Sequence, residues 1–542
     1  MKQSFCLFCY CFFASLLALV AYASQESRPN IIVYFADDIS AREIPAYGST
    51  VWSNDKDGGD CSDPEMRAVT PVLDRFSNEG CLIKNAWAAT ICNPSRAMML
   101  TGRYAHRTKW WNNGDRGVYV DPWGNLTAWP VYESSPILIS HVAKNAGYAT
   151  FWTGKTQMAG TYEAHGFDEG CFSPGRWTDL DNPNTDFRLL YEKRNGEKVL
   201  INEDTGKPVD TYKQHSWNFH PEVKLMNHPT APNKIVWWPN TEEAKEQYGI
   251  TTYGPDVELF YSLDFIERQH KAKKPFLVYH TSHLGHDAYD WLDPDSDSKW
   301  PGTPVVEWDG QGYLRKEVRI SGDHGDYDTH GTVTEPGIHE HIKYIDYQLW
   351  CYLQKLEELG IADNTVIIFT ADNGTSGFGK NNPTQQRGSH VPMIIYATGM
   401  TKQGHLDTMA SLSDIHPTIA ELVGYEMPED YEIDGKSLVP FLFEDAPQHR
   451  RWVYAYRGPE QFIRGKYVLK DGGGKWWDVA QIPSDLTSFP EIEDWSEVPE
   501  THRAESERLL QLLPTYDFYF DEHESPGIPN RFPVKSYKRK NK

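Results

Sequence analysis

Three apolar runs, each followed by polar residues, constrain the fold of this chain more than any other feature. They lie within residues 28–38, 274–280 and 362–374. A continuous apolar run without alternation is typical of a strand that is buried on both faces of a parallel sheet. Because strands that alternate with helices indicate an α/β fold, we predict a mostly parallel central sheet flanked by helices. The amphipathic helical patterns lie at residues 137–146, 257–270, 342–359 and 414–423.

Oxygen-bearing side chains follow two of these predicted strands directly. Asp37 and Asp38 come after the first run, and Asp372 and Asn373 come after the last. In open α/β sheets, ligands bind beyond the carboxyl ends of the strands. Hard cations prefer such oxygen ligands, so the two pairs together indicate a calcium or magnesium site. Either pair alone is better explained as a turn or a helix cap than as a metal site.

The length of the chain indicates more than one domain. Its 542 residues exceed what one ordinary core organises, and short strand patterns replace the α/β rhythm beyond about residue 441. We therefore predict a large α/β domain over residues 24–440 and a smaller α+β domain over residues 441–542. Two polar, aromatic segments, about 172–248 and 287–337, are too long for ordinary loops and are expected to be functional insertions.

The first residues resemble a secretory signal. Lys2 precedes an apolar stretch over residues 12–20, and Ala21-Tyr22-Ala23 forms a typical cleavage site. We expect residues 1–23 to be removed and the protein to be exported to the periplasm or the extracellular space. The apolar stretch is too short to span a bilayer comfortably, and no later segment is a better candidate. The formal net charge of −23 argues against a nucleic-acid partner.

The cysteine count points to one thiol with a separate fate. Five cysteines follow the predicted cleavage site, and an odd number in an oxidising compartment leaves one that cannot pair within the chain. Cys92 is the natural candidate, while the other four either form disulfides or stay buried. These four are Cys61, Cys81, Cys171 and Cys351.

Cys92 begins the run Cys-Asn-Pro-Ser-Arg, which leads through an apolar stretch to Thr101-Gly102-Arg103. This run resembles the signature of the type I, formylglycine-dependent sulfatases. Further landmarks of that family follow in family order, from Arg28 to the C-terminal region. They are residues 70–76, 147–150, 166–169 and 434–438. The resemblance implies the alkaline-phosphatase-like fold and hydrolysis of sulfate esters, with no redox or organic cofactor beyond the modified cysteine.

The resemblance also implies a set of site residues. A maturation enzyme would oxidise Cys92 to formylglycine, whose hydrated form is the nucleophile that attacks sulfur. Arg96 would hold this nucleophile, and Lys155 and Lys380 would contact the sulfate and the leaving oxygen, where fixed cations stabilise spreading negative charge. The implied calcium ligands are Asp37, Asp38, Cys92, Asp372 and Asn373.

A histidine is expected to donate a proton to the departing alcohol. His283 follows the second predicted strand, where the family usually carries a substrate-contacting histidine. Histidine suits general acid catalysis near neutral pH, so we assign this role to His283, with His286 as the rival candidate.

The sequence departs from the family pattern in two places. Gln157 stands where the family usually has histidine, and glutamine cannot accept the proton whose removal restores the aldehyde. Turnover would then use another base, such as Asp372 or His106, or would be slow. The usual E-G-G-x-R-V-P sequence is also altered, because residues 386–392 read Gln-Arg-Gly-Ser-His-Val-Pro.

The predicted substrate is a sulfated polysaccharide or oligosaccharide. Aromatic and polar side chains in the two insertions suit sugar rings, and Trp110-Trp111 could line such a site or belong to the core. Two alternatives remain open. One is a phosphate or phosphonate ester hydrolase of the same superfamily, and the other is a sulfated-glycan binding protein that has lost turnover. The oligomeric state is not predicted.

Overall fold

The computed structural model describes most of the predicted large domain and the chain as far as residue 523. The predicted signal over residues 1–23 and large parts of both predicted insertions lie outside the described residues. The described ranges are 28–54, 59–173, 189–202, 206, 223–239, 253–286, 303, 305–316, 320–321, 328–329 and 338–523.

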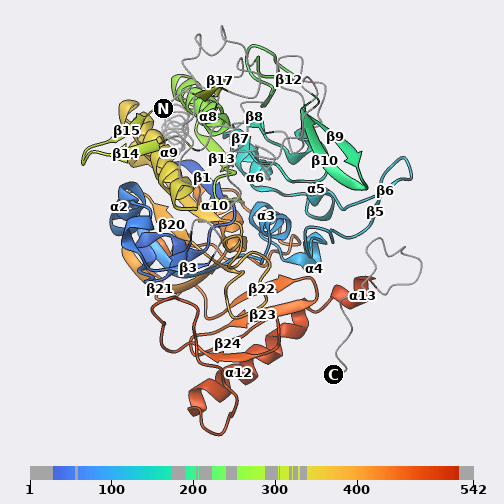
Figure 1. The fold of residues 1–542 in the computed structure, drawn as a ribbon, viewed down its shortest axis with the longest axis vertical. Helices are drawn as coiled ribbons and strands as arrows, with labels where there is room; N and C mark the ends of the chain where they lie inside the picture. Colours follow the sequence, from blue (N-terminus) through green and yellow to red (C-terminus); the bar gives the residue numbers. More distant parts are fainter. Residues whose placement is uncertain are drawn as a thin grey trace, which may run out of the picture.

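An 11-stranded sheet forms the centre of the molecule (Figure 1). Its strand order is β12-β11-β8-β7-β13-β1-β18-β20-β4-β19, and β21 pairs with β4. The five strands from β8 to β18 are mutually parallel, and antiparallel strands extend the sheet at both ends. The central strands are β8 (Glu169–Phe172), β7 (Ala149–Gly154), β13 (Phe276–Thr281), β1 (Asn30–Ala36) and β18 (Thr365–Ala371). The others are β4 (Cys81–Trp87), β11 (Lys224–Met226), β12 (Ile235–Trp237), β19 (His390–Val391), β20 (Met393–Tyr396) and β21 (Gly404–Ser411).

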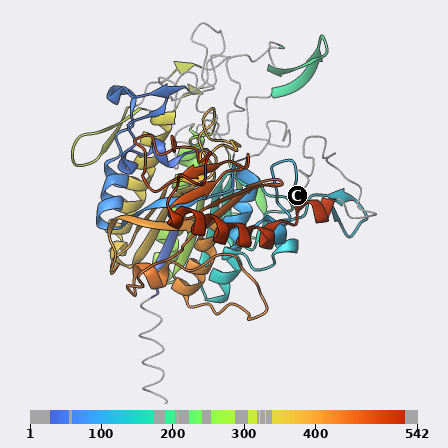
Figure 2. The same cartoon turned by 90° about the horizontal axis from the view of Figure 1, so that it is seen from below.

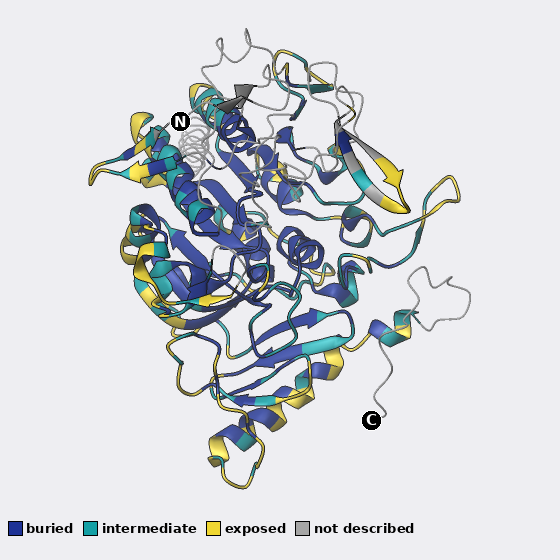
Figure 3. Cartoon of the chain, viewed as in Figure 1, coloured by how far each residue is buried: buried dark blue, intermediate teal, exposed yellow. Residues whose placement is uncertain are grey.

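The three apolar runs predicted as strands are neighbours in this sheet. They form β13, β1 and β18, and Ile32 pairs with Val278 on one side and with Ile367 on the other. Every residue of β1 is buried, as expected for a central strand covered on both faces (Figure 3). The predicted fold class is therefore confirmed.

Helices flank the sheet. The predicted helices are present as α6, α8, α9 and α10, and α8 packs against β7 and β13. Helix α9 contacts both α8 and α2, whereas α10 contacts α6 and α3. The bounds are α2 (Pro71–Glu79), α3 (Cys92–Thr101), α6 (Ile139–Asn145), α8 (Gly254–Lys271), α9 (Ile338–Glu358) and α10 (Ile415–Val423). Within the described ranges, no helix combines the length and the hydropathy needed to cross a membrane.

A second, antiparallel sheet of four strands lies in the C-terminal part, with α12 (Glu500–Leu512) packed on β24 (Figures 1 and 2). One of its faces shares a core cluster with Trp87 of β4 and Met409 of β21, which joins it to the central sheet. The domain boundary near residue 441 stays a prediction. The strands are β22 (Val453–Arg457), β23 (Glu460–Arg464), β24 (Val468–Lys470) and β25 (Trp476–Asp478).

The described parts of the two predicted insertions include hairpins. In the first, β9 (Leu189–Arg194) pairs with β10 (Glu197–Asn202), and this hairpin stands off the body of the molecule in Figure 2. In the second, β14 (Val305–Trp308) pairs with β15 (Tyr313–Lys316).

The structure answers two questions that the sequence left open. One is whether Trp110 and Trp111 belong to the core, and the other is whether the four remaining cysteines form disulfides. Trp110 and Trp111 are 0% and 1% exposed, so they belong to the core and offer no face to a sugar. The suggestion that they line a sugar site was wrong, because both indole rings are buried. The indole N–H of Trp110 donates to the carbonyl of Trp129, and that of Trp111 donates to the carboxylate of Glu522. The five cysteines of the described chain are all free thiols. The four cysteines other than Cys92 therefore form no disulfide within the described residues.

Candidate active site

The carboxyl ends of β1 and β18 place three carboxylates together. Ala36 pairs with Ala371 in the parallel register, so Asp37 and Asp372 leave the sheet side by side. The Asp372 N–H donates to the carbonyl of Ala36 at 3.1 Å, and the Asp38 N–H donates to Oδ1 of Asp372 at 2.9 Å. Asp38 has a φ of 53°, a left-handed conformation that turns the chain at the end of the strand.

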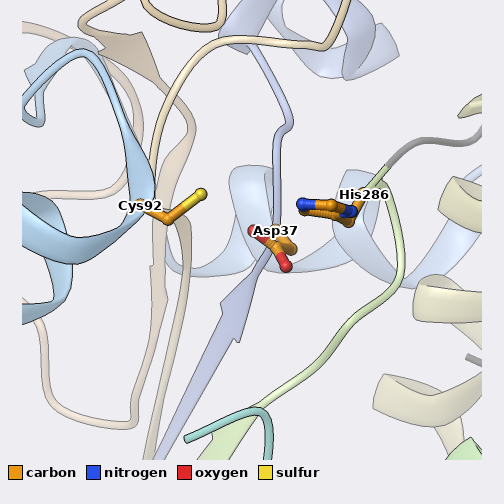
Figure 4. Close-up of side chains that lie close together, drawn as sticks. All are labelled: Asp37, Cys92 and His286. Atoms are coloured by element: carbon orange, nitrogen blue, oxygen red, sulfur yellow. The ribbon is translucent and has the colours of Figure 1, made fainter. Parts of the chain in front are cut away.

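Cys92 reaches the same place from another element. It is the first residue of α3, and its Sγ lies 3.7 Å from Oδ1 of Asp38. Figure 4 shows the thiol extending from α3 toward Asp37, which lies between it and His286. Burial and the charge of Asp372 raise the pKa of this thiol well above its usual value. An unmodified Cys92 is therefore a neutral thiol and a poor nucleophile.

Three cationic side chains face the carboxylates. The Arg96 Nη2 lies 2.8 Å from Oδ2 of Asp372 and 3.3 Å from Oδ1 of Asp37. Arg96 occupies the turn of α3 after Cys92, which brings its guanidinium to the end of β18. The two predicted lysines also pair with carboxylates of the described chain, Lys155 with Asp37 and Lys380 with Asp38.

The two candidate histidines both lie at the site but differ in their surroundings. His283 is 2% exposed, and burial followed by the charge of Lys155 lowers its pKa well below the usual value. The Nε2 of His286 lies 3.0 Å from Nζ of Lys380 and 3.9 Å from Oδ2 of Asp38. Because an ammonium can only donate, this contact makes Nε2 of His286 an acceptor and leaves the proton on Nδ1.

The residues predicted to bind calcium fit a hard cation. One ligand atom from each of Asp37, Asp38, Cys92 and Asp372 lies within 4.8 Å of the others. Asn373 donates from Nδ2 to Asp38 at 2.7 Å, so its carbonyl oxygen is the atom left to coordinate. That oxygen and Oδ1 of Asp37 are buried and accept no hydrogen bond from the described residues. Buried oxygens of this kind are what calcium ligation requires.

The crowding of carboxylates has an electrostatic consequence. Burial and the neighbouring charge of Asp37 raise the pKa of Asp372 to about 8, whereas Lys155 and Arg96 keep the pKa of Asp37 well below its usual value. Like charges held close together cannot all ionise at low cost. A divalent cation between them would reverse this effect and favour full ionisation.

Asp372 and His106 were the two residues expected to act as the base in place of Gln157, and only Asp372 lies at the site. His106 stacks on Phe518 and lies 3.7 Å from Asp434, in contact with the C-terminal part of the chain. Gln157 has a φ of 44°, and its side-chain oxygen is buried without a hydrogen-bond partner among the described residues.

Two residues that support the site could not be recognised from the sequence. Asn113 accepts the Asn93 N–H at 2.9 Å, which fixes the first turn of α3 beside the nucleophile. His341 of α9 accepts the Gly285 N–H at 3.0 Å and so holds the loop between the two candidate histidines. Neither residue belongs to a recognisable motif, because both act through contacts between distant parts of the chain.

Comparison with known proteins finds similar sequences and a similar fold. The family model described as Sulfatase matches residues 29–425. Over 527 residues, the chain is 23% identical to an N-acetylglucosamine-6-O-sulfatase of Bacteroides thetaiotaomicron, a match that covers 90% of this chain and 86% of the relative. Over 451 residues, it is 26% identical to an N-acetylgalactosamine-6-sulfatase of Sus scrofa, covering 79% and 69%.

A solved structure shows the same fold. The crystal structure of Ps i-CgsB in complex with k-i-k-neocarrahexaose superposes with a TM-score of 0.59 at 17% sequence identity. The match covers 91% of this chain and 93% of that chain.

Proposed function

We propose, from the premise that this chain belongs to the sulfatase family and is a sulfuric ester hydrolase, that its substrate is a sulfated polysaccharide or oligosaccharide. The observation that carries the proposal is the cluster of three carboxylates and three cations around Cys92 at the ends of β1 and β18. The carbohydrate class is supported by the relatives, whose names specify sulfated amino sugars, and by the oligosaccharide complex of the structural neighbour.

The proposal includes a modified residue and a metal ion. Cys92 would be converted to formylglycine by a maturation enzyme, which supplies a geminal diol as the nucleophile in place of a thiol. Asp37, Asp38, Asp372 and Asn373, together with residue 92, would hold calcium, which supplies positive charge for a sulfate oxygen and favours the ionised nucleophile. The buried oxygens of Asp37 and Asn373 that accept no hydrogen bond from the described residues support this assignment.

The lysines would change partners when substrate binds. Lys155 and Lys380 neutralise Asp37 and Asp38 in the structure described here. With a cation bound to those carboxylates, both ammonium groups become available to a sulfate group at the same place. They would then stabilise the charge that develops on sulfate oxygens and on the leaving oxygen.

Proton transfer is assigned to two groups. His283 would protonate the departing alcohol, and the negative charge of a bound sulfate would raise the pKa of its imidazole from its lowered value. Asp372 is the nearby carboxylate that would accept a proton from the nucleophile, and Arg96 would keep that carboxylate in position. Gln157 stands where the family usually has the histidine that removes the later proton and restores the aldehyde, and an amide does not accept that proton near neutral pH.

Export is part of the proposal. The signal-like residues 1–23 support a periplasmic or extracellular location, where sulfated polymers are accessible to an enzyme. The proposed catalytic domain spans residues 24–440, and the smaller domain spans residues 441–542.

A substrate panel tests the proposal. The full chain, co-expressed with a formylglycine-generating enzyme and supplied with calcium, is incubated with sulfated oligosaccharides, and free sulfate is measured by ion chromatography. Matched aryl sulfate and aryl phosphate esters serve as the comparison. We expect release from at least one oligosaccharide. Faster release of phosphate than of sulfate would favour the ester hydrolase alternative, and glycan binding without release would favour a binding protein.

A further inference from the structure

A pocket of about 280 Å³ lies beside β4 and β19, and none of the predicted site residues lines it. Its wall combines Lys84 of β4, His405 of β21, Arg464 of β23 and the loop that carries Phe489. No aspartate or glutamate is among its lining residues in the described part of the chain. The pocket is thus basic in a protein whose formal net charge is −23.

Arg464 is the unusual member of this wall. It is 3% exposed, and across the described ranges no carboxylate lies within 4.0 Å of its guanidinium. The guanidinium donates from Nη1 to Oε1 of Gln386 and lies over the ring of Phe489 at 5.5 Å. Its Nε is buried and has no hydrogen-bond partner in the described part of the chain.

The partner of Arg464 is held in a neutral hydrogen-bond chain. The His390 Nε2–H donates to the carbonyl of Lys84 at 2.8 Å, which leaves Nδ1 to accept from Nε2 of Gln386 at 3.2 Å. The same amide nitrogen donates to the carbonyl of Leu486 at 3.0 Å. These contacts fix the amide so that its oxygen faces Arg464. Burial lowers the pKa of His390 to about 4, so neither His390 nor the Gln386 amide carries a charge near neutral pH.

A buried guanidinium without a counter-charge is costly. Burial lowers the pKa of Arg464 to about 10, and the more distant Asp407 and Glu505 offset this effect only in part. Removing one partner of a buried ion pair is strongly destabilising, because the remaining charge stays unpaired. Gln386 is an amide, so it gives the Arg464 guanidinium a neutral acceptor and no counter-charge.

We propose that this pocket is a second anion-binding site, which takes a small tetrahedral oxyanion such as sulfate or phosphate at Arg464. Lys84 and His405 would face the same ion from the pocket wall. The inference does not rest on the proposed function, because it depends on an unpaired buried charge outside the candidate active site. Since the active site also binds sulfate if the proposed function is right, the test must separate the two sites.

The variant Gln386→Glu separates them. It places a carboxylate next to the Arg464 guanidinium, and this negative charge neutralises the guanidinium in place of a bound anion. The variant changes no residue of the candidate active site. Arg451→Gln is the matched control, because Arg451 is an exposed arginine that lines a different pocket. Isothermal titration of each full-length protein with sodium sulfate, at constant ionic strength, gives the number of sites and their affinities.

We expect wild type and Arg451→Gln to show the same anion site, and Gln386→Glu to bind at that site about tenfold more weakly or not at all. A parallel titration with phosphate should show the same loss. A titration with a sulfated monosaccharide distinguishes a free anion from a sulfate carried by a sugar, since at the Arg464 pocket only the free anion is expected to bind, and Gln386→Glu should leave any binding of the sugar sulfate unchanged. Superimposable sulfate titrations of wild type and Gln386→Glu would overturn the proposal.

A second measurement locates the ion directly. Crystals of the wild-type protein soaked in selenate should show an anomalous peak within hydrogen-bond distance of Arg464. A peak at the candidate active site alone would also overturn the proposal. This readout remains informative if Gln386→Glu fails to fold.

Discussion

The Nη2 atom of Arg96 lies 2.8 Å from Oδ2 of Asp372, although 276 positions separate the two residues in the sequence. The contact joins the first turns of α3 to the carboxyl end of β18. It thereby holds the helix that presents Cys92 against the strand that presents the metal-ligand candidates.

Replacing this guanidinium is expected to destabilise the fold. Arg96→Met leaves Asp37 and Asp372 buried without their shared counter-charge, and such losses cost about 3–5 kcal/mol. The control Arg75→Gln removes an arginine that is 41% exposed and pairs with Glu79, where about 1 kcal/mol or less is expected. Urea denaturation measures both. Equal losses in the two variants would contradict the role of Arg96.

Removing divalent cations is expected to lower the melting temperature. Asp37, Asp38 and Asp372 repel one another when no cation is bound, and a ligand at 100 times its Kd adds about 2.7 kcal/mol to stability. Thermal denaturation with a chelator, and after adding back calcium or magnesium, measures the effect. Calcium should restore more stability than magnesium, and Asp372→Asn should reduce the response. An unchanged melting temperature after chelation would argue against a metal site.

The two site lysines are expected to support catalysis. Lys155→Ala and Lys380→Ala each remove a cation that pairs with a site carboxylate, and losing one such charge-stabilising group costs about 10²–10³ in kcat. Lys144 is a suitable control, since it is 41% exposed and pairs with Asp168 instead. Steady-state sulfate release compares the three variants. A Lys144→Ala defect as large as the other two would indicate a general effect on folding.

The assignment of the general acid predicts a dependence on the leaving group. A sugar alcohol needs a proton as it departs, whereas nitrophenolate does not. His283→Ala should therefore lose about 10²–10⁴ in rate with a sugar sulfate and little with nitrophenyl sulfate. His286→Ala, which removes the neighbour of Lys380, should affect both substrates to a similar extent. The opposite pattern would transfer the role to His286.

Glu258 predicts a pH dependence of stability that is independent of catalysis. It is 1% exposed, and burial raises its pKa from the ordinary 4.5 to about 8 in the folded protein. The folded state therefore binds a proton that the unfolded state has released between these two pKa values, so this group's contribution to stability falls as pH rises from about 4.5 to 8.

The variant Glu258→Gln tests this dependence. It should stabilise the protein relative to wild type by a few kcal/mol at pH 8 and by much less at pH 5. Chemical denaturation at the two pH values measures the difference. An advantage of the glutamine variant that does not change with pH would show that Glu258 does not titrate as described.

The sequence predicted the parts of the site that local patterns encode. The apolar runs identified β1, β13 and β18, because only a strand buried on both faces needs such continuity. The paired oxygen ligands after β1 and β18 then meet through the parallel register alone. Cys92 and its signature were recognisable by resemblance, and α3 brings this residue to the same edge of the sheet.

The parts that the sequence did not predict depend on contacts between distant segments. The pairing of Arg464 with Gln386 spans 78 positions and has no local pattern. Trp110 and Trp111 show a different difficulty, since their composition suits both a sugar site and a core, and only their burial decides between these. The sequence also cannot choose between His283 and His286, because both follow β13 within a few residues.

We propose that Cys92, once modified, is the nucleophile of a sulfate-ester hydrolase. The most direct test measures sulfate release by ion chromatography from a sulfated oligosaccharide, with wild type and Cys92→Ala compared at equal concentration. Mass spectrometry of the peptide that contains residue 92 gives the fraction converted to aldehyde. We expect release in proportion to that fraction and none from Cys92→Ala. Equal release by the two proteins, or no release across the panel from fully converted enzyme, would contradict it.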